Sequence, residues 1–154
     1  MTPLTIRIDD LSGEPIRRLL ALHLAGMHEH SPPDAVHALD LSGLQTPQIT
    51  VWSAWRGESL AGIGALKDLG GGAAELKSFR THPNHLRQGV AAAILDHAIA
   101  AARARGLKRL SLETGRGDAF EPALALYRSR GFAAGELFAD YPPSDFSQFL
   151  HLEL

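Results

Sequence analysis

The sequence contains no cysteine, and this absence excludes disulfide bonds and thiolate metal sites. It also lacks an excess of basic residues, since 15 Lys and Arg stand against 17 Asp and Glu and the formal net charge is −2. Proteins that bind nucleic acid usually carry a basic excess, so we expect no nucleic-acid partner.

Long apolar runs, internal repeats and low-complexity tracts are absent as well. No run approaches the ~20 apolar residues that a membrane-spanning helix requires, so we expect no membrane partner. Residues 1–10 are mixed and polar, unlike a secretory signal, which predicts a cytoplasmic protein. Hydrophobic residues make up 45% of the 154 residues, enough for a core, and the length predicts a single domain over residues 1–154.

The most informative stretch runs from residue 75 to residue 106. Residues 75–81 have the pattern of a strand, residues 82–85 form a turn that contains proline, and residues 86–105 have the pattern of a helix. The first N–H groups of a helix have no partner within it and carry partial positive charge, so they can bind a phosphate oxygen. This order of elements favours an anion site, and an ordinary strand-to-helix connection is the alternative.

Three residues at the start of this helix support the anion site. Gly89 lets a ligand approach the backbone closely because it has no Cβ, and Arg87 and Gln88 add a charge and side-chain donors beside it.

The other segments alternate between strand and helix patterns. Gly62 and Gly64 interrupt one strand and indicate a bulge or a close contact. Two strand–helix units within a run of hairpins predict a mixed α/β sheet. Strands are predicted over residues 4–8, 48–55, 59–66, 75–81, 108–114 and 146–154, and helices over residues 14–28, 34–39, 86–105 and 119–129.

Two motifs and the order of elements resemble the GNAT N-acetyltransferase superfamily. Residues 83–91 resemble its acetyl-CoA pyrophosphate loop, Gln/Arg-x-x-Gly-x-Gly/Ala, with matches at Gly89 and Ala91; Leu86 stands where Arg or Gln is usual, and Arg87 can supply that charge. Residues 125–132 resemble its Leu-Tyr-x-x-x-Gly-Phe motif, which contains Tyr127 here. Residues 36–41, 64–67, 75–81 and 111–115 are similar to a bacterial branch described as resembling an indole-3-acetic acid acetyltransferase.

The resemblance implies a single-domain fold in which helices flank a mixed, mostly antiparallel sheet that is splayed between its fourth and fifth strands. It also implies acetyl-CoA as co-substrate, no metal, and direct attack on the thioester by the amine of a small molecule or a peptide. A non-catalytic acyl-CoA-binding or sensing module on the same fold is the alternative. A homodimer is left open.

The resemblance places the cofactor on the edge of the strand over residues 75–81 and on the turn and helix that follow. The strand edge would bond the pantetheine amides, and the helix start would hold the pyrophosphate. The implied cofactor-binding residues are Phe79, Arg80, Thr81, Arg87, Gln88, Gly89, Val90, Ala91, Ala92, Gly115, Phe120 and Tyr127.

The same resemblance implies two catalytic residues. Tyr127 would act as the acid at the departing sulfur, because a phenol with an ordinary pKa of ~10 can donate to a thiolate; a buried packing role is the alternative. Glu75 would act as the base that accepts the amine proton, and it could instead pair with a cation on the next strand. Glu113 and three histidines, His28, His30 and His37, are rival bases.

The acceptor pocket is predicted in loops that proline interrupts, because specificity usually resides in loops between rigid elements. With His23, residues 28–37 hold four of the eight histidines, so a metal-dependent hydrolase is a third interpretation. Their spacing matches no clear ligand set, so we predict no metal. The predicted acceptor-binding residues are His28, His30, His37, Leu39 and Tyr141.

Overall fold

The computed structural model describes residues 2–154, in which seven strands form one sheet in the order β1-β2-β3-β4-β5-β7-β6. Every neighbouring pair is antiparallel except β4 and β5, which confirms the mixed, mostly antiparallel sheet. The strands are β1 (Leu4–Ile8), β2 (Ile49–Arg56), β3 (Ser59–Gly70), β4 (Ala73–Thr81), β5 (Arg109–Thr114), β6 (Ala133–Ala134) and β7 (Gln148–Glu153).

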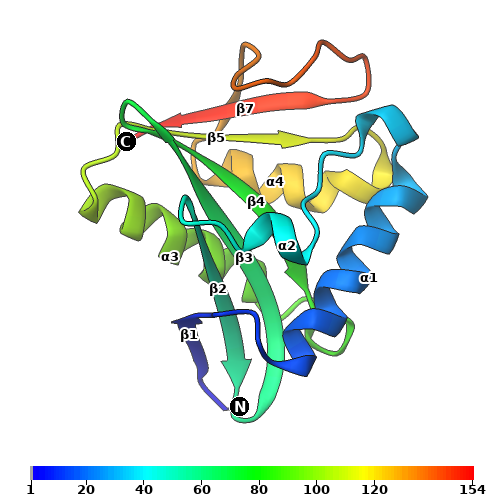
Figure 1. Cartoon of the computed structure of the whole chain (residues 1–154), viewed down its shortest axis with the longest axis vertical. Helices are drawn as coiled ribbons and strands as arrows, with labels where there is room; N and C mark the ends of the chain where they lie inside the picture. Colours follow the sequence, from blue (N-terminus) through cyan, green and yellow to red (C-terminus); the bar gives the residue numbers. More distant parts are fainter. Residues whose placement is uncertain (1) are drawn as a thin grey trace.

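Four α-helices within residues 2–154 flank this sheet (Figure 1), with three short 3-10 turns between elements. The order of elements matches the predicted one. The helices are α1 (Glu14–His30), α2 (Leu41–Leu44), α3 (Val90–Ala104) and α4 (Glu121–Ser129), and the 3-10 turns are η1 (Pro33–Ala35), η2 (Pro83–His85) and η3 (Asp118–Phe120).

The two faces of the sheet are covered by different helices. On one face, Leu95 of α3 and Leu124 of α4 pack in one apolar cluster with strand residues such as Leu76. On the other face, Leu19 of α1 and Leu44 of α2 pack in a second cluster with β2 and β3. Because side chains alternate along a strand, β2 and β3 each contribute to both clusters.

Strands β4 and β5 pair only at their beginnings and then diverge, which confirms the predicted splay. The parallel pairing covers three residues of each strand, from Ala73 with Arg109 to Glu75 with Ser111. Beyond these pairs the two ribbons separate (Figure 1). The later part of β4 therefore has a backbone edge that β5 does not cover.

A β-bulge lies in β4 where this divergence begins. Ile63 of β3 is opposite Arg80 and Ala65 is opposite Lys77, so two residues of β4 face one residue of β3. One of the two, Ser78, has a φ of 57°, a left-handed conformation that is uncommon for residues other than glycine. A bulge bends its strand and increases its twist, so it turns the end of β4 away from β5.

The glycines of β3 allow α3 to lie close to the sheet, which is the close contact that the sequence indicated as an alternative to a bulge. A Cβ atom on Gly64 would lie 2.7 Å from Cγ2 of Ile94 and 3.0 Å from the ring of Phe79. One on Gly62 would lie 2.8 Å from Cγ1 of Val90. These distances leave no room for a side chain at either glycine.

Two of the predicted helices differ from the structure by more than two residues. The short helix predicted over residues 34–39 is wrong, because the carboxylate of Asp40 accepts from the Gly43 N–H at 2.8 Å and so starts α2 at Leu41 instead. The long helix starts at Val90 and not at residue 86, because Arg87 and Gly89 have φ values of 60° and 77° that an α-helix cannot contain.

Residues 2–154 contain no helix with the length and apolar character that crossing a bilayer requires. The predicted cytoplasmic location stays a prediction.

We predict that Gly64→Ala lowers the free energy of unfolding by ~1–3 kcal/mol, because overpacking a filled core costs this much. Urea unfolding should show a lower midpoint with an unchanged slope. Gly13→Ala is the matched control, since its Cβ would meet only Cδ of Pro15 at 3.8 Å. Equal midpoints for Gly64→Ala and the wild type would contradict the close packing of α3 on β3.

Candidate active site

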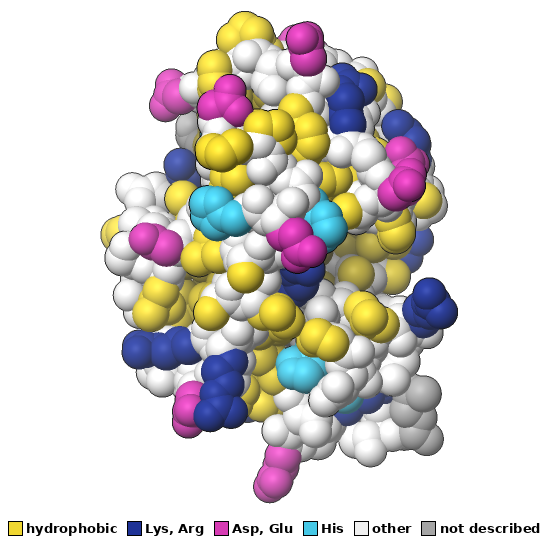
Figure 2. All heavy atoms as spheres, turned by 90° about the vertical axis from the view of Figure 1, so that its right-hand side faces the viewer, with side chains coloured by type: hydrophobic (Ala, Val, Ile, Leu, Met, Phe, Trp, Pro, Cys, Tyr) yellow, Lys and Arg dark blue, Asp and Glu magenta, His cyan; other side chains and the backbone are white. Residues whose placement is uncertain are grey.

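A cleft of about 650 Å³ lies where β4 and β5 diverge. Its walls come from α1, β4, β5, α4 and the loop before β7, and part of its opening lies on the face shown in Figure 2, where histidine, acidic and basic side chains gather near apolar ones. Residues that line it include His23, Gly26, Met27, His30, His37, Glu75, Lys77, Phe79, Arg80, Thr81, Leu86, Ala91, Glu113, Phe120, Leu126, Tyr127 and Tyr141.

The turn before α3 adjoins one end of the cleft, where Leu86 and Ala91 contribute to the wall. Gly89 is the N-cap of α3 in a left-handed conformation, and Ala93 N–H is the first amide to bond back, to the Gly89 carbonyl at 3.0 Å. The earlier amides of this turn have no partner within the helix. A Cβ on Gly89 would have no atom within 4 Å, so the space in front of the turn is open. Such a helix start is suited to an anion.

The structure brings six of the predicted cofactor residues to the cleft wall and leaves six outside it. Gln88 bonds to Arg56, the Val90 side chain is only 1% exposed in the core, and Gly115 packs against Phe146. Val90 and Ala92 can contribute only backbone amides. The six at the wall are Phe79, Arg80, Thr81, Ala91, Phe120 and Tyr127; the six outside are Arg87, Gln88, Gly89, Val90, Ala92 and Gly115.

Tyr127 lies on α4 on the same sheet face as α3. Its ring makes edge contacts with Phe79, at 6.5 Å between centroids, and with Phe132, at 5.8 Å. Burial raises the pKa of Tyr127 to about 12, so the hydroxyl keeps its proton near neutral pH. This group can donate a hydrogen bond or a proton into the cleft, and it cannot act as a base there.

Glu75 lies on the opposite sheet face in a network of three polar side chains. Its carboxylate, 3% exposed, accepts from Lys77 Nζ at 3.2 Å and from the Tyr141 hydroxyl. Lys77 Nζ also donates to the Tyr141 oxygen at 2.8 Å. Burial and the negative charge of Glu75 raise the pKa of Tyr141. Tyr141 therefore connects the open cleft to the buried carboxylate.

Glu113 of β5 is the second carboxylate in the cleft wall. Burial raises its pKa, and the nearby Glu75 adds to the rise, while Ser147, His37 and Lys77 oppose it. A carboxyl group whose pKa is raised is closer to accepting a proton near neutral pH, so Glu113 also fits a base.

The histidines do not form one site. His30 and His37 line the cleft, and the ring of His37 meets that of Tyr141 edge-on with 5.0 Å between centroids. His28 is exposed on α1 away from the cleft, and Leu39 packs against the second apolar cluster. No group of three His, Asp or Glu side chains within residues 2–154 is placed to hold a metal ion.

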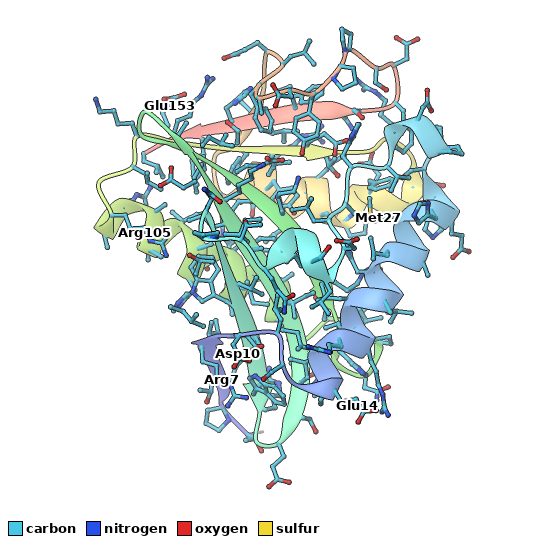
Figure 3. The ribbon with its side chains drawn as sticks, viewed as in Figure 1. Arg7, Asp10, Glu14, Met27, Arg105 and Glu153 are labelled. Atoms are coloured by element: carbon cyan, nitrogen blue, oxygen red, sulfur yellow. The ribbon has the colours of Figure 1, made fainter. Side chains whose placement is uncertain are left out.

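Sequence reasoning missed several residues of the cleft wall. Gly26 and Met27 fall at helical spacing from His23 and His30, so the repeat of three and four residues along α1 was the available signal. Figure 3 labels Met27 on α1 beside the sheet. Lys77 follows Glu75 by two residues in the same strand, and this spacing indicated that the two side chains share a face.

Comparison with known proteins gives a consistent result. Residues 15–132 match the Acetyltransferase (GNAT) family. The chain is 51% identical over 150 residues to the uncharacterized N-acetyltransferase YedL of Escherichia coli, covering 97% of this chain and 94% of that protein. It is 36% identical over 124 residues to an IAA acetyltransferase of Azospirillum brasilense, covering 80% of each.

Solved structures show the same fold. A putative acyl-CoA N-acyltransferase from Klebsiella pneumoniae superposes with a TM-score of 0.81 and 28% identity, covering 98% of this chain and 97% of that one. A Bacillus subtilis acetyltransferase in complex with CoA superposes with a TM-score of 0.71 and 18% identity, covering 99% of both chains.

Proposed function

This chain belongs to the GNAT family of acetyltransferases and is an acyltransferase, and from this premise we propose that it transfers the acetyl group of acetyl-CoA to the amine of a small molecule. The observation that carries the proposal is the cleft between the diverging β4 and β5, with an open helix start at one end and buried acid–base groups in its wall. A volume of about 650 Å³ lies in the range of small-molecule sites, which favours a small acceptor over a peptide.

We propose that the cofactor half of the cleft is built from backbone groups. The first amides of α3, from Gly89 to Ala92, would hold the pyrophosphate, because they are unpaired and face open space. The free edge of β4 from Phe79 to Thr81 would bond the pantetheine amides, as an added strand does. Acetyl-CoA would supply the activated acyl group.

In this proposal Tyr127 is the acid that stabilises the departing thiolate. Its hydroxyl is protonated at neutral pH, and its ring is fixed between Phe79 and Phe132. A donor that is already fixed in place does not have to reorganise when negative charge develops on the sulfur. Such preorganised donors stabilise the developing charge most effectively.

Glu75 is the proposed base, and Tyr141 carries the proton to it. The amine must lose a proton as its nitrogen bonds to the thioester carbonyl carbon. Tyr141 oxygen can accept that proton while its own proton passes to Glu75, because the two groups already share a hydrogen bond. Lys77 donates to both oxygens and so holds this pair in place.

The function is tested by following free-thiol release from acetyl-CoA against a panel of small amines. The proposal expects saturable release with at least one amine and none without an amine. Tight CoA binding with no release for any amine would instead identify a non-catalytic acyl-CoA-binding module. The homodimer considered from the sequence stays a prediction, and sedimentation would determine it.

We predict that Gly89→Asp weakens CoA binding at least ~10-fold, since a like charge beside a bound anion costs on the order of 1.4 kcal/mol or more. Gly89→Asn is the matched control, because Asn has the same size without the charge and also tolerates a positive φ. Isothermal calorimetry measures both. Equal affinities for the Asp and Asn variants would place the pyrophosphate elsewhere.

We predict that Tyr127→Phe lowers kcat by ~10²-fold or more, the usual contribution of a positioned acid. The change removes only the hydroxyl, so CoA affinity and the thermal midpoint should stay within error of the wild type. The thiol-release assay reads kcat, and calorimetry reads affinity. Full kcat under conditions in which chemistry limits turnover would leave Tyr127 with a packing role only.

We predict that Glu75→Gln removes the acidic limb of the kcat/KM profile against pH. A base must be unprotonated, so activity is present above its pKa and falls as the pH falls through that value. The same acceptor is used for every variant, so that the titration of its amine affects all the pH profiles equally. Glu113→Gln is the comparison: if it removes the limb and Glu75→Gln leaves it unshifted, Glu113 is the base.

A further inference from the structure

Arg80 presents a positive charge in the cleft that no acidic side chain neutralises. Arg18, Arg109 and Arg130 each form an ion pair with a carboxylate, whereas Arg80 forms none within residues 2–154. The guanidinium is about half-buried in the cleft wall, and its pKa is lowered by burial with no acidic neighbour to raise it. A buried charge is costly unless a partner of opposite sign completes it.

His23 holds this guanidinium without compensating its charge. Arg80 Nε donates to His23 Nδ1 at 3.1 Å, and Arg80 Nη2 donates to the His23 carbonyl oxygen at 3.2 Å. Burial, with the charge of Arg80, lowers the pKa of His23 to about 4, so the imidazole is neutral near pH 7. Two of the five guanidinium N–H groups are used in this way, which leaves a donor edge for a ligand.

Gly26 of α1 provides the space that the guanidinium occupies. A Cβ at this position would lie 2.5 Å from Arg80 Nη2 and 3.3 Å from Cζ. Glycine inside a helix costs roughly 1 kcal/mol relative to alanine, so this position carries a stability cost. The close approach of α1 to Arg80 depends on Gly26, and Gly26 and Arg80 both line the cleft.

Arg80 lies on the sheet face of the acid–base network and not on the face of the cofactor cradle. Arg80 contacts α1 through His23. Glu75 and Lys77 face the same side of β4 as Arg80, because the extra residue of the bulge at Ser78 brings Arg80 to their face. A strand rises about 3.3 Å per residue, so the Cα atoms of Lys77 and Arg80 are on the order of 7–10 Å apart. A small molecule can therefore reach both groups.

We propose that the acceptor is an amino acid or a closely related amine that carries a carboxylate, and that Arg80 binds this carboxylate. Guanidinium and carboxylate groups match in a planar, bidentate geometry, which would orient the amine of the acceptor toward Tyr141. This inference rests on the proposed function, and it adds the substrate class: a simple alkylamine lacks the group that Arg80 binds.

The test uses L-amino acids, each compared with its primary amide, which keeps the amine and removes the carboxylate. Thiol release from acetyl-CoA should favour at least one amino acid over its amide. Arg80→Gln should raise KM for that amino acid roughly 10- to 100-fold, the value of a charge-assisted hydrogen bond, and leave KM for the amide unchanged. Arg80→Lys should restore part of the affinity.

Arg105→Gln is the matched control for the loss of one positive charge. Arg105 donates to Thr50 at the far end of α3, and Figure 3 shows it on the opposite side of the molecule from Met27. This variant should keep the wild-type KM for both members of each pair. If amides react as well as the amino acids in the wild type, or if Arg80→Gln raises only KM for acetyl-CoA, the inference is overturned.

Calorimetry with the reaction product separates this inference from the proposed function. N-acetyl amino acids should bind to the wild type more tightly than N-acetyl amino acid amides, and Arg80→Gln should abolish the difference. If this pattern is seen and no amine supports turnover, the carboxylate site stands and the proposed acetyl transfer fails. If turnover occurs and the product shows no preference for the carboxylate, the site fails and acetyl transfer stands.

Discussion

The separation of β4 from β5 is the constraint on which the rest of this structure depends. Parallel strands normally satisfy each other's backbone groups, yet here the pairing ends at Glu75 and Ser111. The bulge at Ser78 turns β4 away, and the glycines of β3 let α3 lie close against the sheet. The unpaired edge that results lies beside a cleft, where a ligand with amide groups can complete it.

The same bulge decides which side chains meet. Lys77 and Arg80 are three residues apart, and in a regular strand they would face opposite sides of the sheet. The extra residue brings Arg80 to the face of Glu75 and Lys77, beside α1, while Phe79 faces Tyr127 and α4. The sheet therefore separates the proposed cofactor half of the cleft from the proposed acceptor half, and the gap between β4 and β5 connects them.

The proposed acceptor half has several charged groups in a partly desolvated wall. Glu75 and Lys77 are 3% and 10% exposed, and Glu113 lies close enough to influence the same network. An ion pair at such depth recovers its desolvation cost only with good geometry, so it contributes little net stability. In the proposed mechanism the ion pair would instead hold the Tyr141 hydroxyl and the Glu75 carboxylate in place for proton transfer.

The sequence by itself determined the order of strands and helices, the glycine turn before α3 at Gly89 and the placement of Tyr127 on a helix, because these depend on short-range periodicity and backbone freedom. Only the tertiary structure decided that Tyr141 bonds to Glu75, 66 positions away, and Arg80 to His23, 57 positions away. Such contacts follow from how helices pack on the sheet. The left-handed residue of the bulge is a serine, a residue type that carries no local signal for that conformation, so no local pattern revealed which face Arg80 would take.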